Sequence, residues 1–200
     1  EAFIVDCKAK YPEVELSNGQ DDYIEICDER NSENKYTLDN VRGISTDKKF
    51  IFTKANMDGV SLTSYKIVNN NNFAYVADTS RRGDKIALAL NVTNKPILTS
   101  SIYTTFRCKD RSKLMPEYLY LLLSRSEFDR YARFNSWGSA RETFDWSELC
   151  RVKIPLPPLE VQQSIVDLYK CLEEAKKIAS EAREKLKALC PALVQRAANS

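Results

Sequence analysis

The sequence predicts an α+β protein, in which a β-rich globular domain with short helices is followed by a long C-terminal coiled-coil helix. Three features of the chain predict this. Short apolar segments alternate with turn residues over most of its length, a proline-rich stretch covers residues 152–158, and a heptad repeat of apolar residues follows Pro158. The expected boundaries are 1–153 for the globular domain, 154–159 for a proline-rich connector and 160–200 for the helix.

The β-rich domain is predicted from short apolar segments that are separated by residues favouring tight turns. Glycine, asparagine and proline between the segments provide the positive or restricted φ angles that such turns need. In residues 1–40 the apolar segments predict further strands or short turns, at 2–5 and 23–26. The strands expected in the middle of the chain are 50–52, 65–68, 73–76, 86–90 and 102–107.

Residues 116–134 change to apolar residues at helical spacing, with Pro116 at the start, and predict two short helices or one bent helix. A polar loop of small residues follows at 135–143, which we expect to be exposed. Three prolines in 152–158 remove backbone donors and restrict φ, so this stretch is neither helix nor central strand and should run extended.

The terminal helix carries an uninterrupted heptad seam, with apolar residues spaced alternately four and three positions apart. Such a seam must pack against another long helix, although a helix lying on its own domain remains the alternative. Pro191 should end or kink the helix. The seam residues expected to form a dimerisation helix are Val161, Ile165, Leu168, Leu172, Ala175, Ala179, Ala182, Leu186 and Leu189, with Leu193 beyond them.

The composition argues against catalysis. The chain has no histidine, which removes the commonest general base and every Ser-His or Cys-His nucleophilic arrangement. Its five glycines lie too far apart for a G-x-G phosphate-binding turn, and its six cysteines include no C-x-x-C pair. We therefore expect no catalytic residue, cofactor or metal site, and reduced, mostly buried thiols.

The chain shows no membrane signal. No apolar run approaches the roughly 20 residues that a membrane span needs, and no leader sequence opens the chain. A cytoplasmic protein is expected. Because the numbering begins at Glu1 instead of Met, the sequence can be a fragment of a longer chain.

Charge is unevenly distributed, although the formal net charge is only +2. Residues 1–39 carry 4 basic and 11 acidic side chains, residues 40–159 carry 19 and 11, and residues 160–200 carry 7 and 6. A basic segment is what a phosphate-binding surface requires, because neutralising phosphates releases counterions. A solvated surface is the alternative interpretation.

Several segments together resemble the specificity subunits of type I restriction-modification systems. The junction at 153–163, Lys-Ile-Pro-Leu-Pro-Pro-Leu-Glu-Val-Gln-Gln, is similar to the family's passage from a recognition domain into a conserved helix. The likeness covers about residues 40–190. The other segments that carry it are 65–68, 73–76, Arg82-Gly83, 100–107, 116–119 and 138–141.

This resemblance implies a non-catalytic subunit with two recognition domains, each of which binds one half of a bipartite DNA site. Two long antiparallel helices separate the domains, and the subunit docks DNA adenine methyltransferase subunits, with a restriction subunit joining the full complex. The present chain has one domain and one helix. It is therefore either a half-length subunit that homodimerises or a fragment that pairs with the second half of a longer chain.

The predicted contacts with double-stranded DNA are basic residues in loops, because Arg and Lys bind phosphates and Arg recognises guanine. Trp137 and Phe144 can stack on DNA, although anchoring of their loop in the core is the expected role. The alternative function is a coiled-coil-dimerising adaptor with a protein-binding head. The candidate DNA-binding residues are Arg81, Arg82, Lys85, Lys48, Lys49, Arg42 and Arg141.

Overall fold

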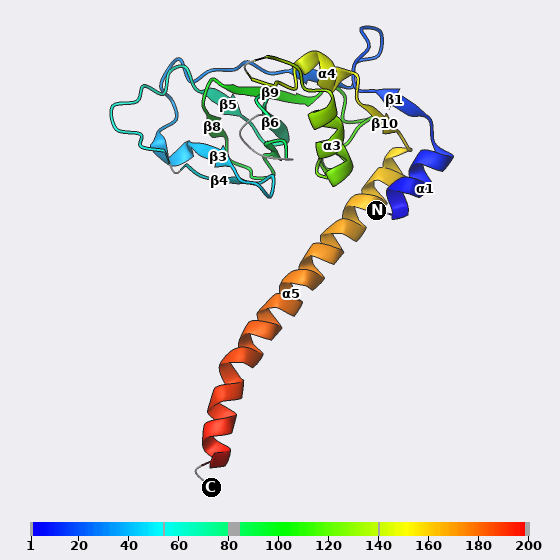
Figure 1. Cartoon of the computed structure of the whole chain (residues 1–200). Coiled ribbons are helices and arrows are strands. Elements are labelled where there is room, and N and C mark those ends of the chain that lie inside the picture. Colours follow the sequence, from blue (N-terminus) through cyan, green and yellow to red (C-terminus); the bar gives the residue numbers. More distant parts are fainter. Residues whose placement is uncertain (1, 54, 80–84, 140, 199–200) are drawn as a thin grey trace. The chain divides into compact units, whose positions relative to one another are not determined.

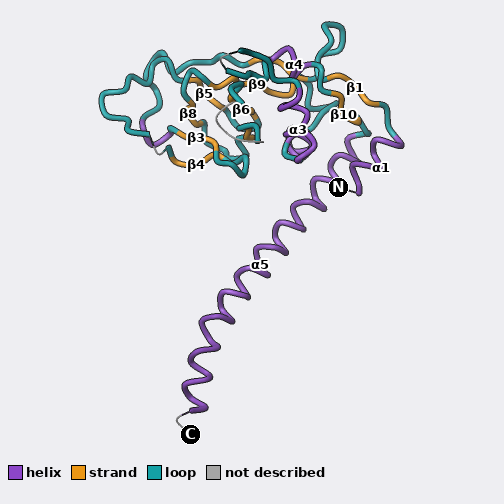
Figure 2. The backbone as a smooth tube through the Cα atoms, viewed as in Figure 1, coloured by secondary structure: helices purple, strands orange, loops and turns teal. Residues whose placement is uncertain are grey.

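The computed structural model describes residues 2–53, 55–79, 85–139 and 141–198. The chain divides into two compact units, Glu1–Gln162 and Gln163–Ser200. In the first unit, short strands are joined by long loops (Figures 1 and 2). Its elements are α1 (Ala2–Lys10), β1 (Glu13–Glu15), β2 (Ile24–Ile26), the 3-10 turn η1 (Leu38–Asn40), β3 (Arg42–Ile44), β4 (Phe50–Phe52), β5 (Lys66–Val68), β6 (Asn72–Val76), β7 (Leu88–Leu90), β8 (Ile97–Thr99), β9 (Tyr103–Cys108), α2 (Pro116–Leu123), α3 (Ser126–Phe134), α4 (Trp146–Cys150) and β10 (Lys153–Pro155).

The centre of the first unit is a four-stranded antiparallel sheet with the order β2-β9-β6-β7. All five residues of β6 are buried, and β6 pairs with a strand on each side. Phe73 on β6 lies opposite Phe106 on β9, and their rings stack with centroids 4.6 Å apart. Trp146 on α4 packs against Phe106 at 5.6 Å. This aromatic cluster holds the sheet and α4 together.

Three two-stranded ladders surround the central sheet: β3-β4, β5-β8 and β1-β10. The first two contribute to the same core. Ile44, Val68 and Ile97 pack in one buried cluster with Ala74 and Val76 of β6. The confirmed α+β fold therefore arises from short strands whose apolar faces meet around β6.

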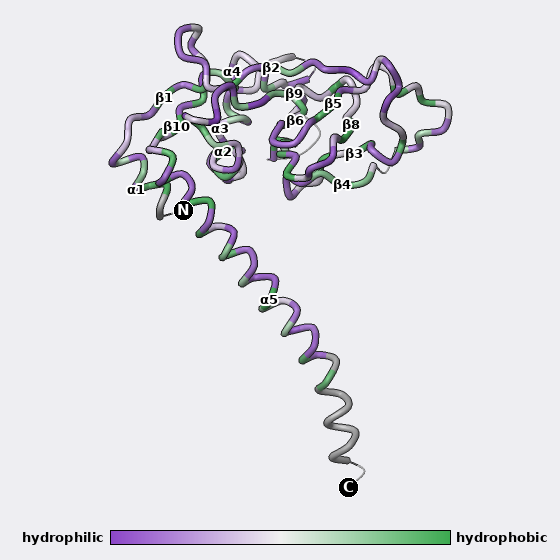
Figure 3. Tube along the Cα trace, turned by 180° about the vertical axis from the view of Figure 1, so that it is seen from behind, coloured by the Kyte–Doolittle hydropathy of each residue, from purple (hydrophilic) through white to green (hydrophobic). Residues whose placement is uncertain are grey.

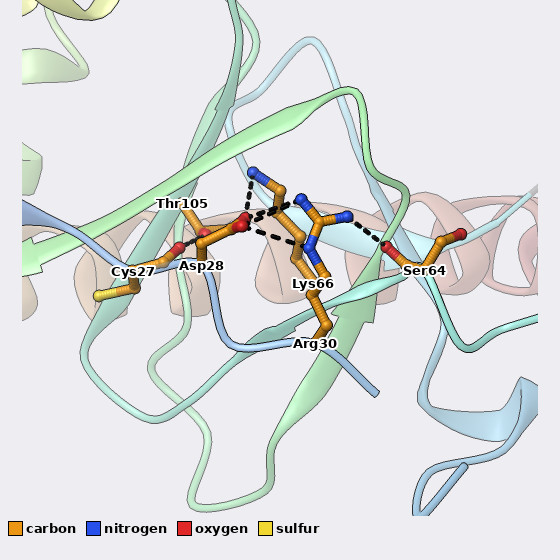
Figure 4. A network of polar contacts seen from close by, with 6 residues as sticks. All are labelled: Cys27, Asp28, Arg30, Ser64, Lys66 and Thr105. Atoms are coloured by element: carbon orange, nitrogen blue, oxygen red, sulfur yellow. Dashed lines mark hydrogen bonds and ion pairs between the residues drawn. The ribbon is translucent and has the colours of Figure 1, made fainter. Parts of the chain in front are cut away.

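A polar network fastens the end of β2 to β5 (Figure 4). The Asp28 carboxylate lies 2.9 Å from Lys66 Nζ and 3.0 Å from Arg30 Nη2. Arg30 also donates to the Ser64 carbonyl at 3.4 Å, and Thr105 Oγ1 donates to the Cys27 carbonyl. The hydrogen bond from Lys66, and to a smaller extent that from Arg30, holds the pKa of Asp28 below its usual value. The acidic N-terminal segment is thereby joined to the basic middle of the chain.

Residues 116–134 form two short helices. Pro116 is the first residue of α2, where its missing N–H leaves no internal bond unmade. Leu119, Leu122 and Leu123 are buried. In α3, Phe128 and Ala132 are buried four residues apart. Periodicity identified both helices because one face of each is consistently apolar.

One expectation for the start of the first unit is corrected, and the stretch at its end that was expected to run extended has a partner strand. Residues 2–5 belong to helix α1, and not to a strand or turn, since Ile4 and Cys7 are buried at helical spacing. In the expected connector, β10 pairs with β1, so that Val14 lies opposite Ile154. The prolines permit this because a two-stranded ladder has an open edge that needs no donor.

Helix α5 runs from Leu159 to Ala198. Gln162, at its beginning, is fully buried and forms three hydrogen bonds. Its Nε2 donates to the carbonyls of Lys113 at 2.8 Å and Pro157 at 2.9 Å, and its Oε1 accepts from the Met115 N–H at 2.9 Å. The first turn of α5 is therefore joined to the loop that precedes α2.

Pro191 does not end α5, because the helix continues for seven residues beyond it, to Ala198. The alternative expectation, a kink at Pro191, stays a prediction. A proline removes only its own N–H bond, and the flanking turns can remain helical. None of the helices in the described ranges is both long enough and apolar enough to span a membrane.

Candidate nucleic-acid interface

A hollow of about 690 Å³, which we call the basic hollow, lies in the first unit. Three of the predicted DNA-binding residues line it, namely Arg42, Lys48 and Lys49. Lys95 lines it as well. The hollow thus combines the β3-β4 ladder with the turn between β7 and β8.

Arg42 and Lys49 are held differently. The Arg42 guanidinium lies 3.8 Å above the Phe52 ring, and its Nη1 donates to the carbonyls of Asp39 and Val41 at 2.6 and 2.9 Å. Lys49 follows the tight turn between β3 and β4 and is exposed. Arg42 is therefore a positioned cation, whereas Lys49 is free to rotate toward a phosphate.

Lys48 is a correction to the expected interface, because its side chain is only 5% exposed. Its Nζ lies 2.7 Å from Asp129 Oδ1 and donates to the Leu123 carbonyl at 2.8 Å. Burial lowers the pKa of Lys48, and the hydrogen bond and charge of Asp129 oppose that effect. An ammonium group so enclosed is not available to DNA, so its role is structural.

Lys85 lies near this ion pair. It is exposed, and its charge contributes to the lowered pKa of Lys48. The next residue, Ile86, donates its N–H to Asp129 Oδ1 at 3.1 Å. Lys48 and Asp129 therefore support the segment that presents Lys85. Arg81 and Arg82 lie outside the described residues.

Arg141 belongs to a loop at 137–143, which we call the tip loop. Arg141 and Trp137 are both exposed, and Trp137 retains 65% of its accessible surface. Trp137 was expected to anchor its loop in the core, and this expectation is wrong because its side chain is exposed. Phe144 is fully buried instead, with its ring 5.9 Å from Phe128 and 6.2 Å from Tyr131.

The tip loop is joined to the strand end that precedes residues 80–84. The Glu142 carbonyl accepts hydrogen bonds from the Thr79 N–H at 3.0 Å and the Thr79 hydroxyl at 3.1 Å. Asp78 and Thr143 form an isolated antiparallel bridge. The segment that ends at Thr79 is thus joined to the tip loop, which follows it by about 60 residues in the sequence.

Part of the basic charge of residues 40–159 is compensated within the chain. Asp22 pairs with Lys109 at 3.4 Å, Glu25 with Arg107 at 2.7 Å, and Asp28 with Lys66. The acidic N-terminal segment thus neutralises cations of the middle segment. Within the described parts of the chain, Lys49, Lys85, Lys95 and Arg141 are exposed and form no ion pair.

A second hollow of about 560 Å³ lies beside α3 and β10. Several of its cations already have carboxylate partners: Arg125 pairs with Glu127, and Arg151 lies 3.0 Å from Glu148. Arg130 and Lys153 also line it and pair with no carboxylate of the described residues. The second hollow thus keeps two cations without an ion pair, whereas the basic hollow keeps three, Arg42, Lys49 and Lys95.

Lys95 was missed by sequence reasoning. It stands in the turn Asn94-Lys95-Pro96, whose asparagine and proline indicate only a connection between strands. Asn91 shapes this turn, because its amide donates to the carbonyls of Val68 at 2.9 Å and Lys95 at 3.0 Å. The sequence could have identified Lys95 as a candidate DNA-binding residue if every Arg and Lys in a predicted turn had been included.

The seam of α5 is largely exposed within the single chain. Leu168 and Leu172 each retain 50% of their accessible surface, Leu186 60% and Leu189 56%. Ala175, Ala179 and Ala182 are exposed too, whereas Val161 and Ile165 are half-buried. Figure 3 shows hydrophobic positions recurring along α5 between hydrophilic ones.

The fold and the site define a class: an α+β binding module with basic loops and a long helix. Within the described ranges, no group of three or more His, Cys, Asp or Glu side chains is arranged to hold a metal ion. The chain belongs to the family of type I restriction modification DNA specificity domains, whose model matches residues 6–188. This family is non-catalytic and recognises DNA targets.

Solved structures share the fold. One belongs to a study of complex assembly and conformational transition of the type I restriction-modification system; it has 16% identity and a TM-score of 0.56, over 94% of this chain and 47% of that chain. The HsdS subunit from Thermoanaerobacter tengcongensis has 20% identity and a TM-score of 0.52, over 90% and 47%. The present chain thus spans about half the length of both. No curated protein matches in sequence.

Proposed function

We propose that this chain recognises one half of a bipartite DNA site for a type I restriction-modification system. The observation that carries this proposal is the family match over residues 6–188. The length supports the half-site: a chain that spans 47% of the subunits with this fold has one recognition domain and one long helix. A second copy, or the remainder of a longer chain, provides the other half.

The proposed DNA-contacting surface combines the basic hollow and the tip loop. Lys49 and Lys95 neutralise phosphates, and Arg42 is oriented by Phe52 for a contact at the edge of the hollow. Arg141 on the tip loop is the candidate for guanine recognition, because a guanidinium donates two parallel hydrogen bonds to guanine O6 and N7. Lys85 adds charge, and Arg81 and Arg82 remain candidates.

Assembly follows from the same proposal. The chain docks DNA adenine methyltransferase subunits in the cytoplasm, and these provide the cofactor and the active site, while a restriction subunit completes the system. The exposed seam of α5 packs against a second long helix, either in a homodimer or within a longer chain.

DNA binding tests the proposal. The chain is co-purified with its methyltransferase subunit, the affinity for duplex DNA is measured over a series of salt concentrations, and the methylated adenines are mapped. We expect a steep loss of affinity with salt and one bipartite methylated sequence. Absence of duplex binding at low salt overturns the proposal and favours a protein-binding adaptor.

Single substitutions locate the surface. Arg141→Ala should weaken binding to the mapped site by about five- to hundredfold and relax specificity at one base pair. Lys49→Ala should weaken binding to all sequences alike and reduce the salt dependence. Lys109→Ala, which removes a cation already paired with Asp22, is the matched control and should change neither. Equal losses for Lys49→Ala and Lys109→Ala would contradict the assigned surface.

A further inference from the structure

The tip loop is rigidly closed at its base. The Trp137 N–H donates to the Thr143 carbonyl at 3.1 Å, and the Thr143 N–H donates to the Trp137 carbonyl at 3.0 Å. Gly138 has φ +140°, and a Cβ there would lie 2.0 Å from the Arg141 carbonyl oxygen. Only glycine fits this position. The loop therefore has a defined backbone shape next to Trp137.

Two further contacts fix the loop from outside. Arg133 at the end of α3 lies 2.8 Å from the Glu142 carboxylate, and Thr79 donates twice to the Glu142 carbonyl. Phe144 supplies the hydrophobic anchor beside the loop, because it is fully buried. The indole of Trp137 is thus not needed to hold the loop, yet 65% of its surface stays in water.

We propose that Trp137 is an aromatic contact of this subunit with DNA, in which its indole stacks on a nucleobase; the inference rests on the proposed function. A large apolar ring held in water by a closed loop is already in position, so binding costs little further ordering. Stacking between an aromatic side chain and a base is favourable and tolerates any base. In a duplex the indole reaches a base face at a kinked or opened base step, and the unstacking of that step offsets part of the gain. Trp137 therefore adds affinity and orientation.

The charges around the loop select DNA as the occupant. Arg141, four residues from Trp137, is exposed and pairs with no carboxylate of the described residues. The only acidic side chain of the loop, Glu142, is paired with Arg133. An exposed guanidinium and an exposed indole on the same loop match a phosphate or base edge and a base ring of the same DNA site. An acidic or apolar partner protein does not regularly offer an anionic group next to an aromatic ring.

Fluorotryptophan incorporated into this chain alone gives a direct test. The chain has two tryptophans, Trp137 and Trp146, so the complex with unlabelled methyltransferase shows two fluorine resonances, which Trp137→Phe assigns. On addition of a short duplex with the methylation-mapped site, the Trp137 resonance should shift through the ring current of the base and lose its solvent isotope effect. The Trp146 resonance, from a ring packed on Phe106, should not change.

Affinity provides the second readout. Trp137→Ala should weaken binding by about five- to hundredfold, and Trp137→Phe should recover part of the loss. Phe134→Ala is the matched control: Phe134 is 80% exposed on α3, outside the tip loop, and its removal should change affinity by less than about twofold. The Trp137 backbone bonds remain in Trp137→Ala, so an unchanged melting temperature verifies folding.

The outcomes separate the two proposals. Duplex binding with an unchanged Trp137 resonance, or equal losses for Trp137→Ala and Phe134→Ala, overturns the role of Trp137 and leaves DNA recognition standing. Absence of duplex binding by the unaltered complex overturns the proposed function and this inference with it.

Discussion

The buried pair Lys48–Asp129 connects segments that lie far apart in the sequence. Lys48 is in the turn between β3 and β4, where its φ is +58°, and its Nζ contacts both α3 and the carbonyl at the end of α2. Asp129 also accepts the Ile86 N–H. The side chains are only 5% and 9% exposed, so the energetic consequence of the pair depends on keeping both charges together.

Removing one charge of this buried pair should lower the free energy of unfolding far more than removing an exposed charge does. Asp129→Asn leaves the Lys48 ammonium buried without a counter-charge and should lower the free energy of unfolding by about 3 kcal/mol. Chemical denaturation at neutral pH measures this. The double variant Lys48→Met/Asp129→Asn, which leaves neither charge buried, should be less harmful than Asp129→Asn alone. A cost for the double variant above that for Asp129→Asn would refute the argument.

Asp28→Asn is the exposed control, because Asp28 retains 49% of its side-chain surface. Its cost should stay below about 1 kcal/mol. Lys66 and Arg30 lower the pKa of Asp28 in the folded protein, so the folded state binds this proton less readily than the unfolded state. The stabilisation is therefore present above the ordinary pKa of 3.8 and disappears as the pH falls through the lowered value.

Neighbouring lysines show why the sequence does not assign the site residues. Lys48 and Lys49 are identical in type and share one turn, yet one is buried and the other exposed. The difference depends on Asp129, which lies 81 positions further along. Loop location and basic character could therefore predict a set of candidates, but not which of them are already paired.

At the scale of elements, Gln162 determines how α5 begins. Its side-chain amide is fully buried and uses donor and acceptor groups at once, with Lys113 and Pro157 as acceptors and Met115 as donor. Glutamate is nearly the same size but has no N–H groups. The two carbonyls would then lose their donor, and a buried carboxylate would face them.

Gln162→Glu should therefore destabilise the first unit by about 2 kcal/mol or more, and increase amide exchange at Met115. Gln163→Glu is the matched control, since Gln163 is exposed and bonds only to Asp167 on the same helix. Hydrogen exchange and denaturation on both variants check the prediction. Similar stability for the two variants would show that the buried amide bonds contribute little.

Periodicity predicted the strands β4, β5, β6, β7 and β9 and the helices α2 and α3. All of these except β4, where Ile51 and Phe52 are exposed, bury most of their apolar residues. It missed β1, β3 and β8, and at β10 it predicted an extended stretch without a partner strand. Glu-Val-Glu and a proline-containing stretch carry little apolar signal, and the pairing of β1 with β10 joins residues about 140 positions apart. Residues 2–5 were misassigned because an apolar run of four fits strand and helix equally.

At the scale of the whole molecule, the charge pattern of the sequence is only partly a property of the surface. The acidic segment 1–39 pairs with cations of the middle through Asp22, Glu25 and Asp28. Net charge per segment therefore overestimates the charge available to DNA. Cations without an ion pair among the described residues line the basic hollow and lie in the loops around residues 85 and 141, but others lie elsewhere on the first unit. These others are Lys10, Lys35, Arg111, Lys113, Arg130 and Lys153.

The exposed seam of α5 yields the last prediction, which concerns assembly. If the chain is a half-length subunit, two copies bury their seams against each other, and Leu172→Glu should weaken self-association by at least about a hundredfold, because it places a charge inside the helix interface. Ser180→Glu adds the same charge outside the seam and should leave association unchanged. Sedimentation across a concentration series, with and without the methyltransferase subunit, measures both. Association that is equally strong in the two variants would mean that another surface joins the copies, while an unaltered chain that stays monomeric at every concentration would mean that its seam is completed by the second half of a longer chain.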